Sequence, residues 1–119
     1  MTFEPPTVVY KRPQIETFIA FLQSKGWTLE DKTNSFCSLR APDNNGEKQN
    51  FTYRIPANEN SRTFDELAHL AVETFADIYD IPLQDLFDLL SLSLADIQKD
   101  VERQPRLLKM KKAILANAS

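Results

Sequence analysis

The chain has 119 residues, of which 42% are hydrophobic and 26% charged, and its formal net charge is −3, a composition typical of one ordinary globular domain. Its single cysteine excludes an intrachain disulfide, and its two glycines are too few for the glycine-rich loops that bind nucleotide phosphates. No apolar run approaches the roughly 18 residues that span a bilayer, and the first residues lack the apolar stretch of a signal peptide, so we expect a cytoplasmic protein.

The charge is distributed unevenly along the chain. Residues 1–58 hold seven basic and six acidic residues, residues 59–102 hold two basic and eleven acidic residues, and residues 103–119 hold five basic residues and no acidic one. Such asymmetry indicates either a charged partner or a contact between the basic tail and the acidic stretch of the same chain. The sequence leaves both interpretations open.

The N-terminal part predicts an irregular arm followed by a helix. Residues 1–12 form the arm, with at most a short strand at residues 8–10. A helix is predicted over residues 13–25, because Pro13 suits the first turn of a helix and Gly26 suits the left-handed position after the last turn. The apolar residues between them recur at the spacing of an amphipathic helix, at Ile15, Phe18, Ile19 and Leu22.

Three short strands in an antiparallel sheet are predicted next. The first lies at residues 27–29, and the other two are marked by alternating apolar residues. These are Cys37, Leu39 and Ala41 on the second strand and Phe51, Tyr53 and Ile55 on the third. Asn45 and Gly46 predict the hairpin turn, because both residues tolerate positive φ. Leu39 and Tyr53 should therefore share a sheet, and Cys37 should be a core residue.

Residues 63–79 predict a long amphipathic helix. Thr63 and Glu66 have the spacing of a capping box, in which the Thr63 hydroxyl accepts a hydrogen bond from the Glu66 amide. One wide arc of the helix is apolar and contains Phe64, Leu67, Ala68, Ala71, Val72, Phe75, Ile78 and Tyr79. The opposite arc is polar and contains Asp65, Glu66, His69, Glu73, Asp77 and Asp80. We expect the apolar arc to pack on the sheet or on the first helix.

Pro82 predicts the start of another helix, with an acidic outer face. Its inward-pointing residues are Leu83, Leu86, Phe87 and Leu90. Asp85 and Asp88 are expected to point outward. Together with Asp77 and Asp80, they form an acidic surface that would attract a basic protein, because complementary charge speeds encounter and selects partners. A solvated acidic surface without a partner is the alternative.

The C-terminal region predicts two further helices. Ser93 caps a short helix with a narrow apolar stripe, Pro105 ends or kinks it, and a last helix is expected over residues 106–116. A second apolar face contains Leu107, Met110 and Ile114. A single contact with the rest of the domain would not cover all of this apolar surface. We therefore expect a homodimer to which residues 94–116 contribute.

These elements predict a single α+β domain of residues 1–119. The arm (1–12) precedes an α-β-β-β-α core (13–80), in which two amphipathic helices pack on a small three-stranded antiparallel sheet, and a helical region (81–119) follows.

The layout of the core resembles that of a known family. A helix, then Gly26 and Trp27 entering a strand, then a hairpin, a strand ending at Pro56 and a second helix resemble small toxin ribonucleases of the HicA type, whose fold is similar to a double-stranded-RNA-binding domain. The resemblance covers residues 13–80 and implies an α-β-β-β-α layout and RNA cleavage. The family carries a catalytic histidine on its sheet and is usually basic, whereas segment 35–38 contains no histidine and this chain is acidic.

Candidate chemical groups are few. His69, with Asp65 and Glu73 one helical turn away on either side, presents an imidazole and carboxylates that could hold a divalent metal ion. Strong zinc signatures contain more cysteine and histidine residues, so a solvated helix face is the preferred interpretation and no metal or cofactor is expected. Cys37 and His69 form the only possible thiol–imidazole pair, and the expected core position of Cys37 argues against catalysis.

The basic tail offers a candidate nucleic-acid-binding surface. Its cations are Arg103, Arg106, Lys109, Lys111 and Lys112. They could neutralise phosphates, although the tail has no aromatic side chain on which bases would stack.

The sequence thus predicts a non-enzymatic, cytoplasmic interaction or regulatory protein that contacts a second copy of itself or another protein. Nucleic-acid binding through the tail is the first alternative. A HicA-like ribonuclease or another enzyme is the second.

Overall fold

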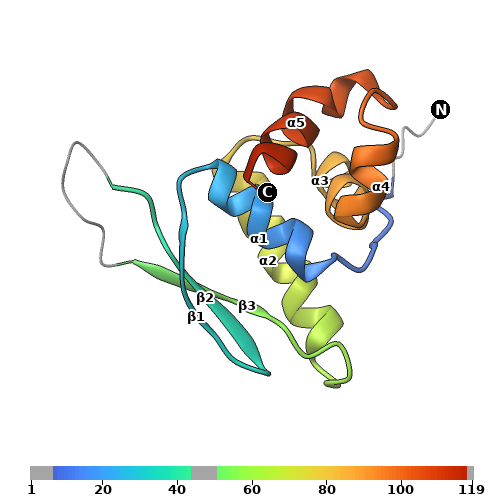
Figure 1. Ribbon diagram of the computed structural model, residues 1–119. Helices are drawn as coiled ribbons and strands as arrows, with labels where there is room; N and C mark the ends of the chain where they lie inside the picture. The colour runs from blue at the N-terminus through green and yellow to red at the C-terminus, as the bar shows by residue number, and fades with distance from the viewer. Residues whose placement is uncertain (1–6, 44–50, 118–119) are drawn as a thin grey trace.

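The structure, a computed structural model, describes residues 7–43 and 51–117. Along the chain, the elements are α1 (Ile15–Ser24), β1 (Thr28–Lys32), β2 (Phe36–Arg40), β3 (Thr52–Pro56), α2 (Phe64–Ile78), α3 (Leu83–Leu90), α4 (Leu94–Lys99), the 3₁₀ turn η1 (Pro105–Leu107) and α5 (Leu108–Asn117) (Figure 1). The predicted α+β class is confirmed, with a helix, three strands, a second helix and then a helical C-terminal region.

The three strands form an antiparallel sheet in the order β1-β2-β3. Leu39 lies opposite Tyr53 in the β2–β3 register, as predicted, and the predicted Asn45-Gly46 turn lies outside the described residues. β1 begins and ends later than predicted. Its residues are mostly polar and show no apolar alternation, so backbone pairing with β2, and not side-chain pattern, determines where the strand lies. A bulge between Leu29 and Asp31 interrupts this pairing.

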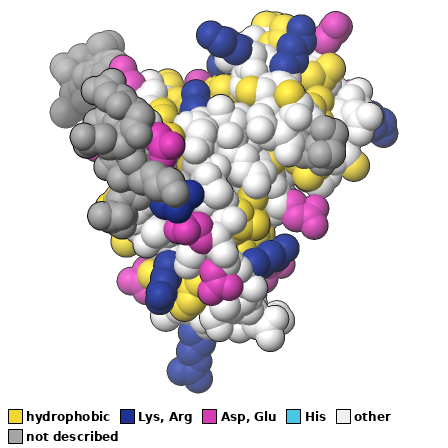
Figure 2. Space-filling model, turned by 60° about the vertical axis from the view of Figure 1, so that its left-hand side comes forward, with side chains coloured by type: hydrophobic (Ala, Val, Ile, Leu, Met, Phe, Trp, Pro, Cys, Tyr) yellow, Lys and Arg dark blue, Asp and Glu magenta, His cyan; other side chains and the backbone are white. Residues whose placement is uncertain are grey.

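α1 and α2 cover one face of the sheet (Figure 1). Cys37, Leu39 and Ile55 point into this layer and are fully buried, so the predicted core position of Cys37 is confirmed. Phe75 of α2 makes edge-on ring contacts with Tyr53 at 5.0 Å and Trp27 at 5.2 Å between ring centroids. On the side of the molecule that carries the sheet, the described residues mix Lys and Arg with Asp and Glu side chains (Figure 2).

α1 ends as the sequence predicts. The Gly26 amide donates a hydrogen bond to the Gln23 carbonyl oxygen (3.0 Å). The Trp27 amide donates to the Leu22 carbonyl oxygen (3.0 Å), which completes the Schellman arrangement of a helix end. Gly26 has a φ of +95°, and a Cβ atom there would lie 2.9 Å from Cβ of Pro42. Both the backbone conformation and the close approach therefore require glycine.

The two predicted N-caps differ in outcome. The Ser93 hydroxyl accepts a hydrogen bond from the Asp96 amide (3.1 Å), which confirms the cap of α4. The predicted capping box of α2 is wrong, since the Thr63 side chain makes no capping bond within the described ranges and lies 3.2 Å from the Ser61 hydroxyl. Thr63 has φ −94° and ψ 0°, outside the extended region that places a capping hydroxyl over the first amides.

The arm runs in an extended path along α2 and α3. Residues 8–10 form no strand in the described part of the arm, and a side chain takes the place of a strand partner for Val9. The Val9 amide donates to Gln84 Oε1 (2.7 Å), and the Val9 carbonyl oxygen accepts from Gln84 Nε2 (3.1 Å). The Gln14 amide donates to the Leu90 carbonyl oxygen (2.7 Å), so α1 begins at Ile15 and not at the predicted Pro13.

The C-terminal helices pack into the same core as α1 and the sheet. Leu107 and Ile114 are fully buried, so the expectation that they form an uncovered apolar face is wrong. Gln104 adopts a left-handed conformation (φ 56°, ψ 78°), which redirects the chain after α4 and returns α5 against α1. Among the described residues, no helix combines the length and the hydropathy needed to cross a membrane.

Candidate protein-binding groove

Acidic residues near the arm are neutralised by basic residues from distant parts of the chain. Asp65 accepts hydrogen bonds from the Tyr10 hydroxyl (2.6 Å) and from Arg12 Nε (3.0 Å) and Nη2 (2.8 Å). The bonds from Arg12 and then Tyr10 lower the pKa of Asp65 to about 2. The Asp65 carboxylate therefore ties the arm to α2.

Asp85 and Asp88 also have partners and do not point freely outward as predicted. Asp88 Oδ1 lies 2.8 Å from Lys11 Nζ and accepts a hydrogen bond from Gln84 Nε2 (3.0 Å). Burial alone would raise the pKa of Asp88, but the bonds from Lys11 and Gln84 and the charge of Arg106 outweigh it and lower the pKa. Arg106 Nε lies 2.9 Å from Asp85 Oδ1, and its Nη2 lies 3.6 Å from Asp88 Oδ2. The basic tail thus contacts the acidic stretch of its own chain.

The candidate phosphate-binding residues of the tail are not equivalent. Lys111 is only 1% exposed, and its Nζ donates a hydrogen bond to the Arg103 carbonyl oxygen (2.8 Å). Burial lowers the pKa of Lys111. Lys111 is therefore out of reach of a phosphate, and Arg106 is occupied by Asp85. The exposed tail cations without an ion pair among the described residues are Arg103, Lys109 and Lys112.

The candidate metal ligands do not converge. His69 Nδ1 pairs directly with Glu73 Oε1, and the His69 ring lies against Tyr10 and Phe87. Asp65 faces the arm instead. Within residues 7–43 and 51–117, no three His, Cys, Asp or Glu side chains are placed to hold a metal ion. Burial raises the pKa of the Cys37 thiol, which opposes formation of a nucleophilic thiolate.

A different set of acidic residues lines an open groove at the C-terminal end of α2. The groove has a volume of about 600 Å³. It is lined by Leu70, Glu73, Thr74, Ala76, Asp77, Ile78, Asp80, Ile81 and Leu83. Leu70 and Ile78 are 56% and 51% exposed, large values for apolar side chains. They are about two turns apart along α2 and about 80° apart around its axis, so they lie on one broad outer stripe of the helix.

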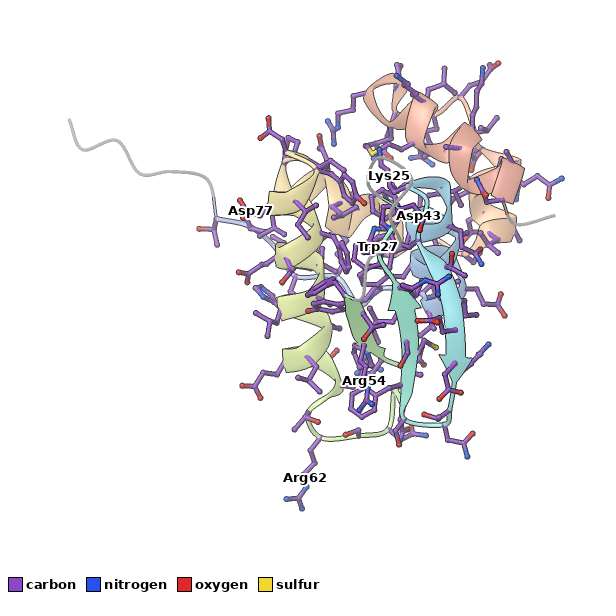
Figure 3. All side chains as sticks on the ribbon, turned by 90° about the vertical axis from the view of Figure 1, so that its left-hand side faces the viewer. Lys25, Trp27, Asp43, Arg54, Arg62 and Asp77 are labelled. Carbon is purple, nitrogen blue, oxygen red and sulfur yellow. The ribbon has the colours of Figure 1, made fainter. Side chains whose placement is uncertain are left out.

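Acidic side chains run beside this apolar stripe. Glu73, Asp77 and Asp80 follow one another at about one turn of helix, and Asp77 lies on the side of α2 that faces away from the sheet (Figure 3). Among the residues that the structure describes, the carboxylates of Asp77 and Asp80 have no ion pair or hydrogen bond. The groove therefore combines exposed apolar surface with uncompensated negative charge.

Local energetics disfavour acidic residues at this end of α2. The C-terminus of a helix carries partial negative charge, so carboxylates there are repelled, and the last turn of α2 contains no basic residue. Asp80 has a φ of 53°, in the left-handed region that favours glycine. Its amide donates to the Asp77 carbonyl oxygen (3.3 Å), and the Ile81 amide donates to the Ala76 carbonyl oxygen (2.9 Å). These backbone bonds account for the left-handed turn at Asp80 but not for a carboxylate at that position, and residues that violate local preference are often functional.

Sequence reasoning placed Asp77 and Asp80 among the interaction residues, and the structure places both on the groove. It missed the apolar half of the groove. Ile78 belongs to the margin of the predicted apolar arc, and the sheet and α1 do not reach that margin. The available signal was Leu70, which falls on the polar side of the helical wheel.

Comparisons with protein-family models, with curated proteins and with solved structures give no match. The element order α1-β1-β2-β3-α2 agrees with the layout that the HicA-type resemblance implies. The single histidine lies on α2, however, and the corresponding strand carries the buried Cys37.

Proposed function

We propose that this protein is a protein-interaction module whose groove on α2 binds a basic, amphipathic helix of a partner protein. The observation that carries the proposal is the position of two unpaired carboxylates, Asp77 and Asp80, beside the exposed side chains of Leu70 and Ile78.

The spacing of the apolar side chains along the groove favours a helical ligand. The stripe from Leu70 to Ile78 extends about 12 Å along α2, because a helix rises about 1.5 Å per residue. A ligand helix would place apolar residues one or two turns apart on this stripe, as in other helix-in-groove complexes. Its Lys and Arg side chains would then meet Glu73, Asp77 and Asp80. Apolar burial would supply affinity, and opposite charge would speed encounter and select the partner.

The alternatives receive less support. Negative charge on the groove repels phosphate, and internal contacts occupy Lys111 and Arg106 of the candidate nucleic-acid-binding tail. Burial of Cys37 and the contact of His69 with Glu73 leave the thiol–imidazole pair without support. The unpaired cysteine agrees with a reducing compartment, and we place the protein in the cytoplasm.

The proposal can be tested with a synthetic helical peptide that has leucine on one face and lysine on the other. A matched peptide with glutamate in place of lysine serves as the control ligand. We expect saturable binding of the lysine peptide, measured by fluorescence anisotropy, and no binding of the glutamate peptide.

Variants then locate the site. Asp77→Asn combined with Asp80→Asn should weaken peptide binding about tenfold, because exposed ion pairs each contribute up to about 1 kcal/mol. Glu59→Gln combined with Glu102→Gln removes the same charge outside the groove and should leave binding unchanged. Equal weakening by both pairs, or no binding by the wild-type protein at concentrations where it is monomeric, would contradict the proposal.

A further inference from the structure

The tail carries exposed cations that have no ion pair with the described residues of the chain. Lys109 and Lys112 lie one turn apart on the exposed face of α5, and Arg103 precedes that helix. Within the described parts of the chain, none of these three side chains has an ion pair. This contrasts with Arg106 and Lys111, which have internal partners.

Apolar side chains accompany these cations. Leu108 and Leu115 are half-buried and lie one turn to either side of Lys112, so one edge of α5 alternates leucine, lysine and leucine. Lys and Arg side chains project beside hydrophobic ones at the top of the molecule, where α5 lies (Figure 2). The exposed edge of α5 therefore has the chemistry that the groove on α2 requires in a ligand.

We infer that the groove of one copy binds the basic edge of α5 from a second copy, so that two reciprocal contacts make a closed dimer. This inference rests on the proposed function and names the partner. The unpaired carboxylates of Asp77 and Asp80 meet Lys109 and Lys112 of the second copy, and Ile78 meets its Leu115. Neither set has an ion pair among the described residues of one copy, so the same complementarity is available twice across a two-fold axis.

The placement of the two surfaces agrees with a reciprocal contact. Asp77 and the C-terminal helices lie toward the same end of the molecule, opposite the end that carries Arg62 (Figure 3). In the proposed dimer the two-fold axis lies near that end, so that each α5 reaches the groove of the other copy. The contact also covers Leu70 and Ile78, whose exposure in a single copy has no compensation.

The test uses sedimentation equilibrium of the full chain and of two charge-reversed variants. We expect the wild-type chain to dimerise at tens of micromolar and to dissociate as salt is raised. The groove variant, Asp77→Lys with Asp80→Lys, should be monomeric, because each groove then repels the tail of the other copy. The tail variant, Lys109→Glu with Lys112→Glu, should be monomeric for the same reason.

Mixing the two variants provides the decisive measurement. In a mixed pair, the basic groove of the groove variant meets the acidic tail of the tail variant, and the acidic groove of the tail variant meets the basic tail of the groove variant. An equimolar mixture should therefore contain heterodimers. Recovery of a dimer shows that both variants are folded and that α5 is the ligand of the groove. A mixture that stays monomeric, or a wild-type dimer that either variant leaves intact, overturns the inference.

The experiments distinguish a failure of the dimer from a failure of the proposed function. A wild-type chain that is monomeric at tens of micromolar but binds the lysine peptide through Asp77 and Asp80 overturns the dimer and leaves the interaction module, with another protein as partner. A chain that neither dimerises nor binds the peptide overturns both.

Discussion

Near the arm, the carboxylates of Asp65, Asp85 and Asp88 each have a cationic partner at 2.8 or 2.9 Å. At the end of α2, those of Asp77 and Asp80 have none among the described residues. The two regions belong to the same acidic stretch and have similar composition. The comparison teaches that acidic content alone does not identify a binding surface. A paired carboxylate holds the fold together, and an unpaired one beside exposed apolar side chains is available to a partner.

The largest expected difference concerns Asp88, whose side chain is only 13% exposed. Asp88→Ala removes the anion beside Lys11 and Arg106 and one of the two acceptors of Gln84 Nε2, so it should lower the free energy of unfolding by about 2 kcal/mol. Asp77→Ala should change it by less than about 0.5 kcal/mol, since this exposed carboxylate has no partner to lose in the part of the chain that the structure describes. Urea denaturation measures both. Equal losses would remove the distinction between the two regions.

Asp80 offers the next test, because its backbone is left-handed. Asp80→Gly should stabilise the protein by about 1 kcal/mol, through removal of the Cβ strain and of the charge at the helix C-terminus. The same variant should bind the lysine peptide more weakly. Asp80→Ala keeps the strain and removes the charge, so it is the matched control. A glycine variant no more stable than the alanine variant would contradict the strain argument.

The pH dependence of stability tests the paired region. Because the pKa of Asp65 is lowered from 3.8 to about 2, its contribution is fully present above pH 4 and is lost as pH falls from about 4 to about 2. Asp65→Asn should remove that part of the dependence. The effect is modest, since the Asp65 side chain is half-exposed and its ion pair with Arg12 is screened by solvent. Urea midpoints measured across this pH range provide the check, and parallel curves for the two proteins would argue against it.

The smallest effect is expected in the tail. Arg106→Gln breaks the contacts with Asp85 and Asp88 and should cost about 0.5 kcal/mol, because the Arg106 side chain is mostly exposed. Arg103→Gln removes a cation without an ion pair and should leave the midpoint of unfolding unchanged. If Arg103→Gln were the more destabilising, the division of the tail into internal and free cations would be incorrect.

Sequence periodicity determined most of the fold. Alternation along β2 and β3 predicted the pairing of Leu39 with Tyr53, and Gly26 predicted the end of α1. Such patterns succeed because burial of one face and a left-handed helix end are local requirements, and the residue at each position must meet them. The capping box at Thr63 failed because the conformation of the preceding loop decides where that hydroxyl points.

Only the tertiary structure decided which charged and apolar surfaces remain exposed. Arg12 lies 53 residues before Asp65 in sequence, and Val9 lies 75 residues before Gln84, so no local pattern could have assigned these partners. The burial of Leu107 and Ile114 likewise depends on the turn at Gln104, which returns α5 against α1. The sequence by itself determined that an acidic stretch and a basic tail exist. Long-range packing decided which of their charges neutralise each other and which remain exposed, because a charge is free only where no distant residue is brought within reach of it.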